Sequence, residues 1–258
     1  MARIHPTAVV DPGAKLADDV TIGALCVVDG DVELGPGVEL GSHVLVTGRT
    51  RVGARTHIYP FSAVGVPPQT QGFDGRAGAL VIGADNVIRE HASLHLGLPE
   101  WGALTTIGDH NLIMNGVHVA HDCRVGSHCV LSAQTVLGGH VSIEDYAVLG
   151  GMTAVHQFVR IGESGFTAGG AMVAQDVPPF SRVAGDRARF VGVNRVNLER
   201  RGFEPERIAT IKHAFHLLLH SKLRFEEACR RIEEECADSR DVAHLLAFLC
   251  SAERGFIR

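Results

Sequence analysis

The chain has 258 residues, enough for one large domain or two small ones. Its 30 glycines, 10 prolines, 45% hydrophobic residues and only 5% aromatic residues indicate many turns around a core of small aliphatic side chains, which argues against a disordered chain and against a helix bundle. The net charge of −5 argues against a strongly basic protein that binds nucleic acid.

The sequence carries no signal for export or membrane insertion. No apolar run approaches the ~20 residues of a membrane-spanning helix, and the first residues lack the apolar core of a signal peptide. The six cysteines are scattered and form no Cys-x-x-Cys pair; they are Cys26, Cys123, Cys129, Cys229, Cys236 and Cys250. We therefore expect a reduced protein in the cytoplasm, without a membrane span.

Aliphatic residues recur at every sixth position over most of the chain. Steps of six land on Ile, Val or Leu throughout residues 4–64, 82–94 and 107–161, and a small or β-branched residue such as Ala8 or Val20 often stands four positions later. Such a repeat predicts a short strand and a turn per unit, and three units would close a coil of ~18 residues in a parallel β-helix. A narrow prism of this kind also accounts for the scarcity of aromatic residues.

Two interruptions of the repeat predict loops that leave the prism, near residues 66–80 and 97–105. The second contains the only tryptophan of the chain. Loops on a rigid scaffold often carry function, although a tolerated insertion is an equally good explanation for either one.

The repeat ends near Pro178 and Pro179, and a helical pattern follows. Pro205 between two glutamates predicts a helix start, and aliphatic or aromatic residues then recur at helical spacing. Two more helices are expected over about residues 224–237 and 240–252. We therefore predict a β-helix domain over residues 1–193 and a small helical domain over residues 194–258.

Four of the 15 histidines converge when the chain is folded into coils of ~18 residues. His121 falls into one column with positions 139 and 157, His140 lies one residue past this column and His156 one residue before it. His118 stands half a repeat upstream of His121. Since adjacent coils are about 4.8 Å apart, these imidazoles should share one patch.

Three interpretations compete for this histidine patch: solvated histidines, a zinc site, or acid–base catalysis. Asp122 directly follows His121 and could fix the tautomer of its ring and raise its basicity. The Gly138-Gly139 pair leaves a backbone N–H unobstructed beside the column, a candidate donor to an oxyanion. We favour a general base that acts on a substrate hydroxyl, without metal or cofactor.

Several motifs in one order resemble the UDP-N-acetylglucosamine acyltransferases, a hexapeptide-repeat family that performs the first step of lipid A synthesis. They are NGVHVAHDC (115–123), LGGHVSI (137–143), GGMTAVHQF (150–158), VAQDVPPF (173–180) and RRGF (200–203). The resemblance implies a left-handed β-helix in a homotrimer with active sites between neighbouring prisms. It implies transfer of an (R)-3-hydroxyacyl group from acyl carrier protein to the 3-hydroxyl of the sugar.

The resemblance also implies roles for individual residues. His121 would be the general base, Asp122 its orienting partner and Gly139 the oxyanion donor. The residues implied for binding sugar, phosphates and nucleotide are His118, His140, His156, Gln157, Gln69, Asn194, Arg200 and Arg201. The residues implied for measuring acyl-chain length are Gly169, Phe166 and Arg187.

Four positions depart from the family pattern near the sugar and the nucleotide: Thr70, Gly72, Leu96 and Val196. A paralogue that acylates a different or amino-modified UDP-sugar, with an amide in place of the ester, is therefore the main alternative. A zinc enzyme resembling the gamma-carbonic anhydrases and a non-catalytic scaffold are two further alternatives.

Overall fold

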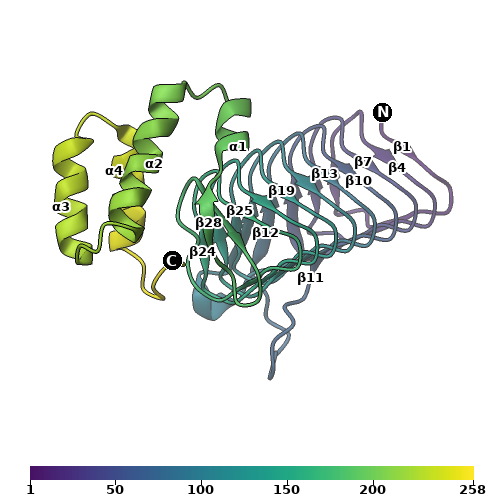
Figure 1. The fold of residues 1–258 in the computed structure, drawn as a ribbon. Helices are drawn as coiled ribbons and strands as arrows, with labels where there is room; N and C mark the ends of the chain where they lie inside the picture. The colour runs from purple at the N-terminus through teal and green to yellow at the C-terminus, as the bar shows by residue number, and fades with distance from the viewer.

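The computed structural model describes residues 1–258 and shows a triangular prism of three parallel sheets, with four helices packed at its C-terminal end (Figure 1). The predicted parallel β-helix is thereby confirmed. None of the helices is long and apolar enough to cross a membrane.

Each coil of the prism contributes one strand to each sheet. The 11 strands of the first sheet are, in order, β1 (Arg3–Ile4), β4 (Thr21–Ile22), β7 (Glu39–Leu40), β10 (His57–Ile58), β13 (Val87–Ile88), β16 (Leu112–Ile113), β19 (Val130–Leu131), β22 (Val148–Leu149), β25 (Phe166–Thr167), β27 (Ser181–Ala184) and β28 (Arg189–Val193). The nine of the second sheet are β2 (Val9–Val10), β5 (Val27–Val28), β8 (Leu45–Val46), β11 (Ala63–Val66), β14 (Ser93–His95), β17 (His118–Val119), β20 (Val136–Leu137), β23 (Ala154–Val155) and β26 (Met172–Val173). The eight of the third sheet are β24 (Arg160–Ile161), β21 (Ser142–Ile143), β18 (Arg124–Val125), β15 (Leu104–Ile107), β12 (Ala79–Ile82), β9 (Arg49–Val52), β6 (Glu33–Leu34) and β3 (Lys15–Leu16).

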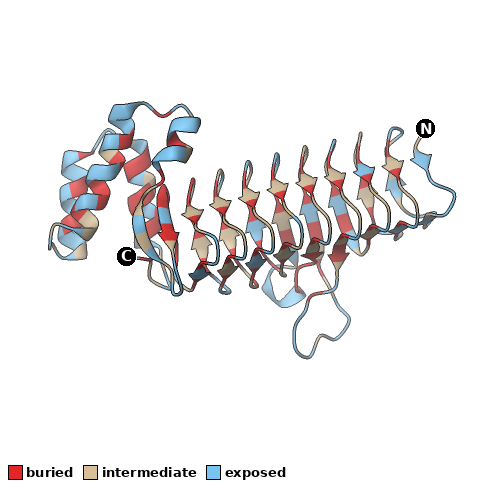
Figure 2. Cartoon of the chain, turned by 45° about the vertical axis from the view of Figure 1, so that its right-hand side comes forward, coloured by how far each residue is buried: buried red, intermediate tan, exposed pale blue.

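The register of the strands gives the coil length. His118 pairs with Val136, a step of 18 residues. The step grows to 30 between His57 and Val87 and to 25 between Ser93 and His118. The two predicted excursions therefore insert 12 and 7 residues into otherwise regular coils. The first protrudes between β11 and β12, and the second contains the 3-10 helix η1 (Pro99–Trp101) (Figures 1 and 2).

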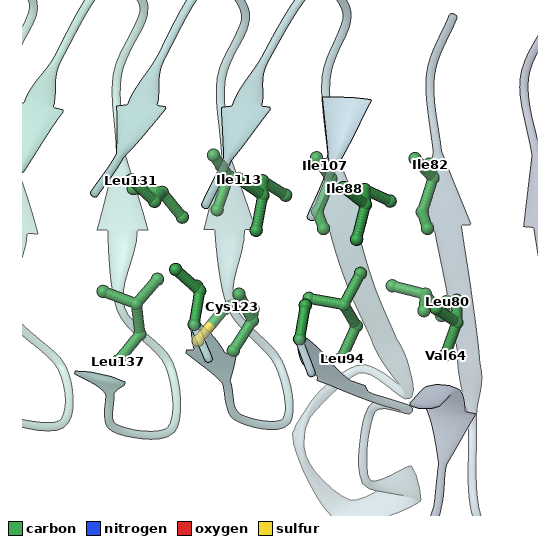
Figure 3. Packing of buried hydrophobic residues seen from close by; sticks show 14 of the residues in the cluster. Val64, Leu80, Ile82, Ile88, Leu94, Ile107, Ile113, Cys123, Leu131 and Leu137 are labelled. Atoms are coloured by element: carbon green, nitrogen blue, oxygen red, sulfur yellow. The ribbon is translucent and has the colours of Figure 1, made fainter. Parts of the chain in front are cut away.

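Aliphatic anchors fill the inside of the prism. Figure 3 shows Leu94, Ile113 and Leu131 pointing into the space between the sheets, coil after coil. The small residue four positions after an anchor occupies the buried corner, as Val20 and Cys123 do. The first coil differs from the prediction, because Ile4 is 44% exposed: no earlier coil covers it.

The three edges of the prism repeat a left-handed backbone conformation. At the edge between the second and third sheets, Asp122, His140 and Phe158 have φ of 58°, 62° and 66°. A type II turn requires such a residue at its third position, and aspartate and histidine tolerate it better than branched side chains do. The side chains of successive coils therefore line up along this edge.

The C-terminal part differs from the prediction in two places. β27 and β28 form an antiparallel hairpin that the six-residue pattern does not predict, and the short helix α1 (Arg195–Arg200) follows it. The three predicted helices are present as α2 (Pro205–Leu219), α3 (Phe225–Glu235) and α4 (Arg240–Cys250). Every helix end that was predicted differs from the observed end by at most two residues. They share a second hydrophobic core, which Phe180 joins from the end of the prism.

Candidate active site

His121 and Asp122 form a hydrogen-bonded pair at the edge between the second and third sheets. His121 Nδ1 lies 2.9 Å from Asp122 Oδ2, and the carboxylate is buried. Both carboxylate oxygens also accept from the Leu98 N–H at 3.2 Å, and the Asp122 N–H donates to Thr105 Oγ1 at 2.8 Å. The second excursion therefore fixes the carboxylate. With Nδ1–H held by Asp122, the Nε2 of His121 is the atom that can accept a proton.

Gly139 packs directly against the ring of His121 from the next coil. A Cβ at this position would lie 2.6 Å from His121 Cε1 and 2.8 Å from Nε2, so only glycine fits here without moving the ring. Its neighbours Gly138 and His140 donate their N–H groups to Val155 O and His121 O, whereas the Gly139 N–H has no acceptor in the chain. This free donor stands beside the atom of His121 that can take a proton.

His118 and His95 form a second pair on the side of the second sheet. His118 Nδ1 lies 3.0 Å from Ser93 Oγ, and burial, aided by the positive charges of His95 and His121, lowers its pKa to about 4. His95 is buried, its Nδ1 lies 2.8 Å from Pro67 O, and its Nε2 has no partner. Burial also lowers the pKa of His95. Both rings are therefore neutral near pH 7.

The six-residue pattern does not predict His95 as a site residue. The seven residues inserted after it shift it out of the 18-residue column in which His121 lies. Its neighbours Ser93 and Leu94 pair with His118 and Val119 of the next coil, and the ring centroids of His95 and His118 lie 4.8 Å apart. Alignment of the repeats across the interruption would have placed it next to His118.

His140 belongs to an aromatic cluster with Trp101 and Phe158, neither of which was predicted. The His140 and Phe158 rings stack at 4.4 Å, and the centroid of Trp101 lies 5.1 Å from His140. His140 also meets His121 edge to face at 5.1 Å, and burial is the main cause that lowers its pKa. A groove of about 840 Å³ runs past this cluster and past Asp122.

His121, Asp122 and His140 could also approach a metal ion, since their ligand atoms lie within 4.8 Å of one another. The Nδ1 of His121 is bonded to the carboxylate, however, so a shared ion would have to replace this hydrogen bond. As it stands, the carboxylate of Asp122 orients the imidazole of His121.

The remaining predicted site residues lie on other coils or on the excursions. His156 and Gln157 are exposed on the same edge as His140, one coil later, and Gln69 is exposed in the first excursion. Gly169 lies at the edge between the first and second sheets, next to Gly151, and Phe166 lies in β25. Arg187 is exposed in the hairpin.

The predicted nucleotide-binding residues lie at the third edge, between the third and first sheets. Asn194 is buried and its side chain donates to Ser164 O at 2.7 Å. Arg201 donates to Glu163 at 2.6 Å and to the Ser164 hydroxyl at 2.7 Å, whereas Arg200 is exposed. A single chain therefore keeps these residues at a different edge from His121.

Comparison with known proteins decides the family. Residues 176–257 match the model described as domain 2 of UDP-N-acetylglucosamine O-acyltransferase, and residues 13–48 and 104–139 match the bacterial transferase hexapeptide model. The acyl-[acyl-carrier-protein]–UDP-N-acetylglucosamine O-acyltransferase of Myxococcus xanthus is 44% identical over 258 residues, 100% of both chains. That of Stenotrophomonas maltophilia is 44% identical over 257 residues, 99% of this chain and 98% of its own.

The chain belongs to the UDP-N-acetylglucosamine O-acyltransferase family. LpxA from Acinetobacter baumannii superposes with a TM-score of 0.95 at 38% identity, covering 99% of each chain. The UDP-N-acetylglucosamine acyltransferase of Francisella novicida superposes with a TM-score of 0.95 at 36% identity, covering 99% of this chain and 94% of its own. The expected left-handed β-helix of hexapeptide repeats is confirmed, and the protein is an acyltransferase.

Proposed function

We propose that this acyltransferase moves an (R)-3-hydroxyacyl chain from acyl carrier protein to the 3-hydroxyl of UDP-N-acetylglucosamine, with His121 as general base. The observation that carries the proposal is the unit of His121, Asp122 and Gly139: an oriented imidazole beside a free backbone donor. The relatives from Myxococcus xanthus and Stenotrophomonas maltophilia are named for the two substrates. Because its six cysteines form no pairing pattern, we place the reaction in the cytoplasm.

The transfer proceeds in two steps. His121 Nε2 takes the proton of the sugar hydroxyl while the oxygen attacks the thioester carbonyl, and the Gly139 N–H donates to the oxyanion that forms. The carbonyl then re-forms, the C–S bond breaks, and the proton on Nε2 passes to the leaving thiolate. Asp122 stabilises the imidazolium between the two steps. His118 and His140 would contact the sugar and its phosphates as neutral rings.

We further propose that the active unit is a homotrimer. The outward positions of the second sheet carry exposed apolar side chains, among them Val27, Val136 and Met172, whereas the third sheet presents charged ones such as Lys15 and Arg51. Covering the apolar faces with neighbouring prisms would stabilise the assembly. It would also bring Asn194, Arg200 and Arg201 of one chain toward the His121 edge of another.

The acyl chain would follow the apolar strip on the second sheet. Val136, Ala154 and Met172 continue outward from His118, strand by strand, toward the C-terminal end of the prism. Gly169, Phe166 and Arg187 lie at this end and would limit the length of the chain.

One position in particular favours a different sugar as the acceptor of the acyl chain. Leu96 stands where the family pattern has an arginine, and its buried side chain packs against Gly48. No cation replaces the lost one there, and Thr70, Gly72 and Val196 also lack a charge. Acylation of an amino-modified UDP-sugar, which forms an amide, is therefore the alternative.

The experiment is an assay of purified protein with an acyl carrier protein thioester and a panel of UDP-sugars. Formation of the 3-O-acyl product of UDP-N-acetylglucosamine, detected by mass spectrometry, is the expected result. Exclusive formation of an amide with a 3-amino sugar would instead establish the alternative. His5→Ala, which changes a histidine in the first coil, serves as the control and should keep wild-type turnover.

A further inference from the structure

The edge between the first and second sheets carries no charged side chain at its repeated left-handed position, unlike the other two edges. Asp122 occupies this position at one of them, and Arg55 and Asp85 occupy it at the other. Along the uncharged edge the side chains are exposed wherever the residue is not glycine. In chain order the residues are Leu25, His43, Phe61, His91, Gly116, Gln134, Met152 and Gly170. A column of large uncharged side chains is typical of a surface that another chain covers.

The two sheets that meet at this edge are largely apolar on their outer faces. The second sheet exposes Val27, Val136 and Met172. The first sheet presents a row of half-buried aliphatic side chains in its middle coils, which are Val87, Leu112, Val130 and Val148. Three prisms that cover both faces must meet at the edge that the two faces share. This edge would therefore lie on the threefold axis of the proposed homotrimer.

Two neighbouring polar side chains on this edge have no partner within their own chain. The ring of His91 stacks on Phe61, with centroids 5.3 Å apart, and forms no hydrogen bond or ion pair. Gly116 occupies the same position in the next coil, where a Cβ would lie 2.9 Å from Gln134 Oε1. The amide of Gln134 therefore folds back over Gly116 and reaches the layer next to that of His91, and adjacent coils are about 4.8 Å apart. This amide forms no hydrogen bond within the chain either.

We propose that the three copies of His91 and Gln134 in the homotrimer bind one divalent transition-metal ion on the threefold axis. The inference rests on the proposed homotrimer and is independent of which sugar accepts the acyl chain. Three imidazole nitrogens and three amide oxygens supply six donors, a set that suits an octahedral ion such as Ni²⁺ or Co²⁺. A single chain supplies only two of these donors, so the site is complete only in the assembly.

Burial at the axis is the reason that these groups need a ligand. In the separate chain, water can solvate the exposed ring of His91 and the exposed amide of Gln134. Neighbouring prisms would exclude this water, and a polar group that is buried without a partner costs free energy. One cation satisfies all six groups, and the layers of Phe61 and Met152 would close the site from both ends. The ion would lie at a different edge from His121, so its role would be structural.

The first test measures stoichiometry, by equilibrium dialysis of the untagged full-length protein against Ni²⁺ followed by elemental analysis. We expect one Ni²⁺ per three chains. His91→Ala and Gln134→Ala should each weaken binding at least about tenfold, because each removes three of the six donors at once. His43→Ala is the matched control: His43 stacks on Phe61 at 4.8 Å on the same edge, but Leu25 and Phe61 beside it offer no ligand. This control should bind Ni²⁺ as the wild type does.

Three outcomes would overturn the site on the axis. Equal binding by the wild type and His91→Ala would exclude His91 as a ligand. One ion per chain, lost in His121→Ala, would place the metal at the cluster of His121, Asp122 and His140 instead. A wild type that light scattering shows to be trimeric and that binds no Ni²⁺ would refute the site and leave the proposed function standing. Conversely, a trimer that binds one Ni²⁺ but forms no acyl product would support the site and refute the proposed function.

The second test reads the donor set and the effect of the ion on the assembly. Six-coordinate Co²⁺ absorbs weakly in the visible range and four-coordinate Co²⁺ strongly, so we expect weak absorption; strong absorption would contradict the contribution of Gln134. Removal of the metal with EDTA should lower the melting temperature of the wild-type trimer and leave that of His91→Ala unchanged. The same shift in both proteins would show that the ion at His91 does not stabilise the trimer.

Discussion

At the scale of single residues, three backbone and side-chain groups act as one unit. Asp122 can hold Nδ1 of His121 only because the Leu98 N–H and Thr105 fix the turn in which it lies. Gly139 has no side chain, and this absence is what allows its N–H and the His121 ring to be neighbours. The position of the His121 ring is therefore determined by contacts from the second excursion and from the next coil, in addition to its own pair with Asp122.

Gly139→Ala tests this packing. The new Cβ would lie 2.6 Å from His121 Cε1, so the ring must move away from Gly139. A displacement of this size should lower kcat by roughly 100-fold. The melting temperature should change little, since the imidazole can swing toward the groove. A variant with wild-type kcat would show that the contact between Gly139 and His121 is unimportant for turnover.

At the scale of elements, the six-residue repeat allowed nearly every strand to be predicted. Each six-residue unit buries one aliphatic anchor and one small corner residue, so a strand can be recognised from the six residues of its own unit. The β27–β28 hairpin and α1 were missed because long-range contacts stabilise them: Asn194 bonds to Ser164 O, and Asn197 to Tyr146 O, 30 and 51 residues away. Local patterns carry no signal for such contacts.

Arg160 connects the prism to the C-terminal helices, and its contribution to the stability of the fold can be measured. It donates to buried Asp176 at 2.8 Å, to Phe248 O at 2.9 Å and to Ser251 Oγ at 3.0 Å. Arg160→Ala would leave the Asp176 carboxylate without its cation, and we expect a loss of about 3 kcal/mol in the free energy of unfolding.

Urea denaturation measures this loss, and Arg55→Ala is its control. Arg55 pairs with Asp85, but its own side chain is largely exposed, so the control should lose much less free energy of unfolding than Arg160→Ala. Equal losses in the two variants would show that Arg160 contributes no more than an ordinary surface ion pair.

At the scale of the whole molecule, the candidate site could be predicted only in part. The length of 18 residues per coil predicted that His118, His121 and His140 lie together, because residues one coil apart stack on each other in a regular prism. It missed His95, Trp101 and the groove, which depend on the two excursions. The arginines at the third edge lie apart from His121 in one chain, and this separation is the main reason to expect an active oligomer.

Leu25→Glu combined with Val27→Glu tests the oligomer. Both side chains are exposed on or beside the second sheet and lie far along the prism from His121. Buried glutamates would disrupt an interface, so light scattering should show monomers and the activity should fall at least tenfold, although circular dichroism stays unchanged. Val81→Glu, on the third sheet, should keep both the trimer and the activity. A monomeric wild type would refute the shared site.

The most direct measurement of the central claim is the turnover of His121→Ala with an acyl carrier protein thioester and UDP-N-acetylglucosamine, followed by mass spectrometry of the product. We predict that this variant forms no detectable product while it keeps the fold and the oligomeric state of the wild type. Turnover at the wild-type rate in a correctly assembled His121→Ala protein would contradict the assignment of His121 as the base.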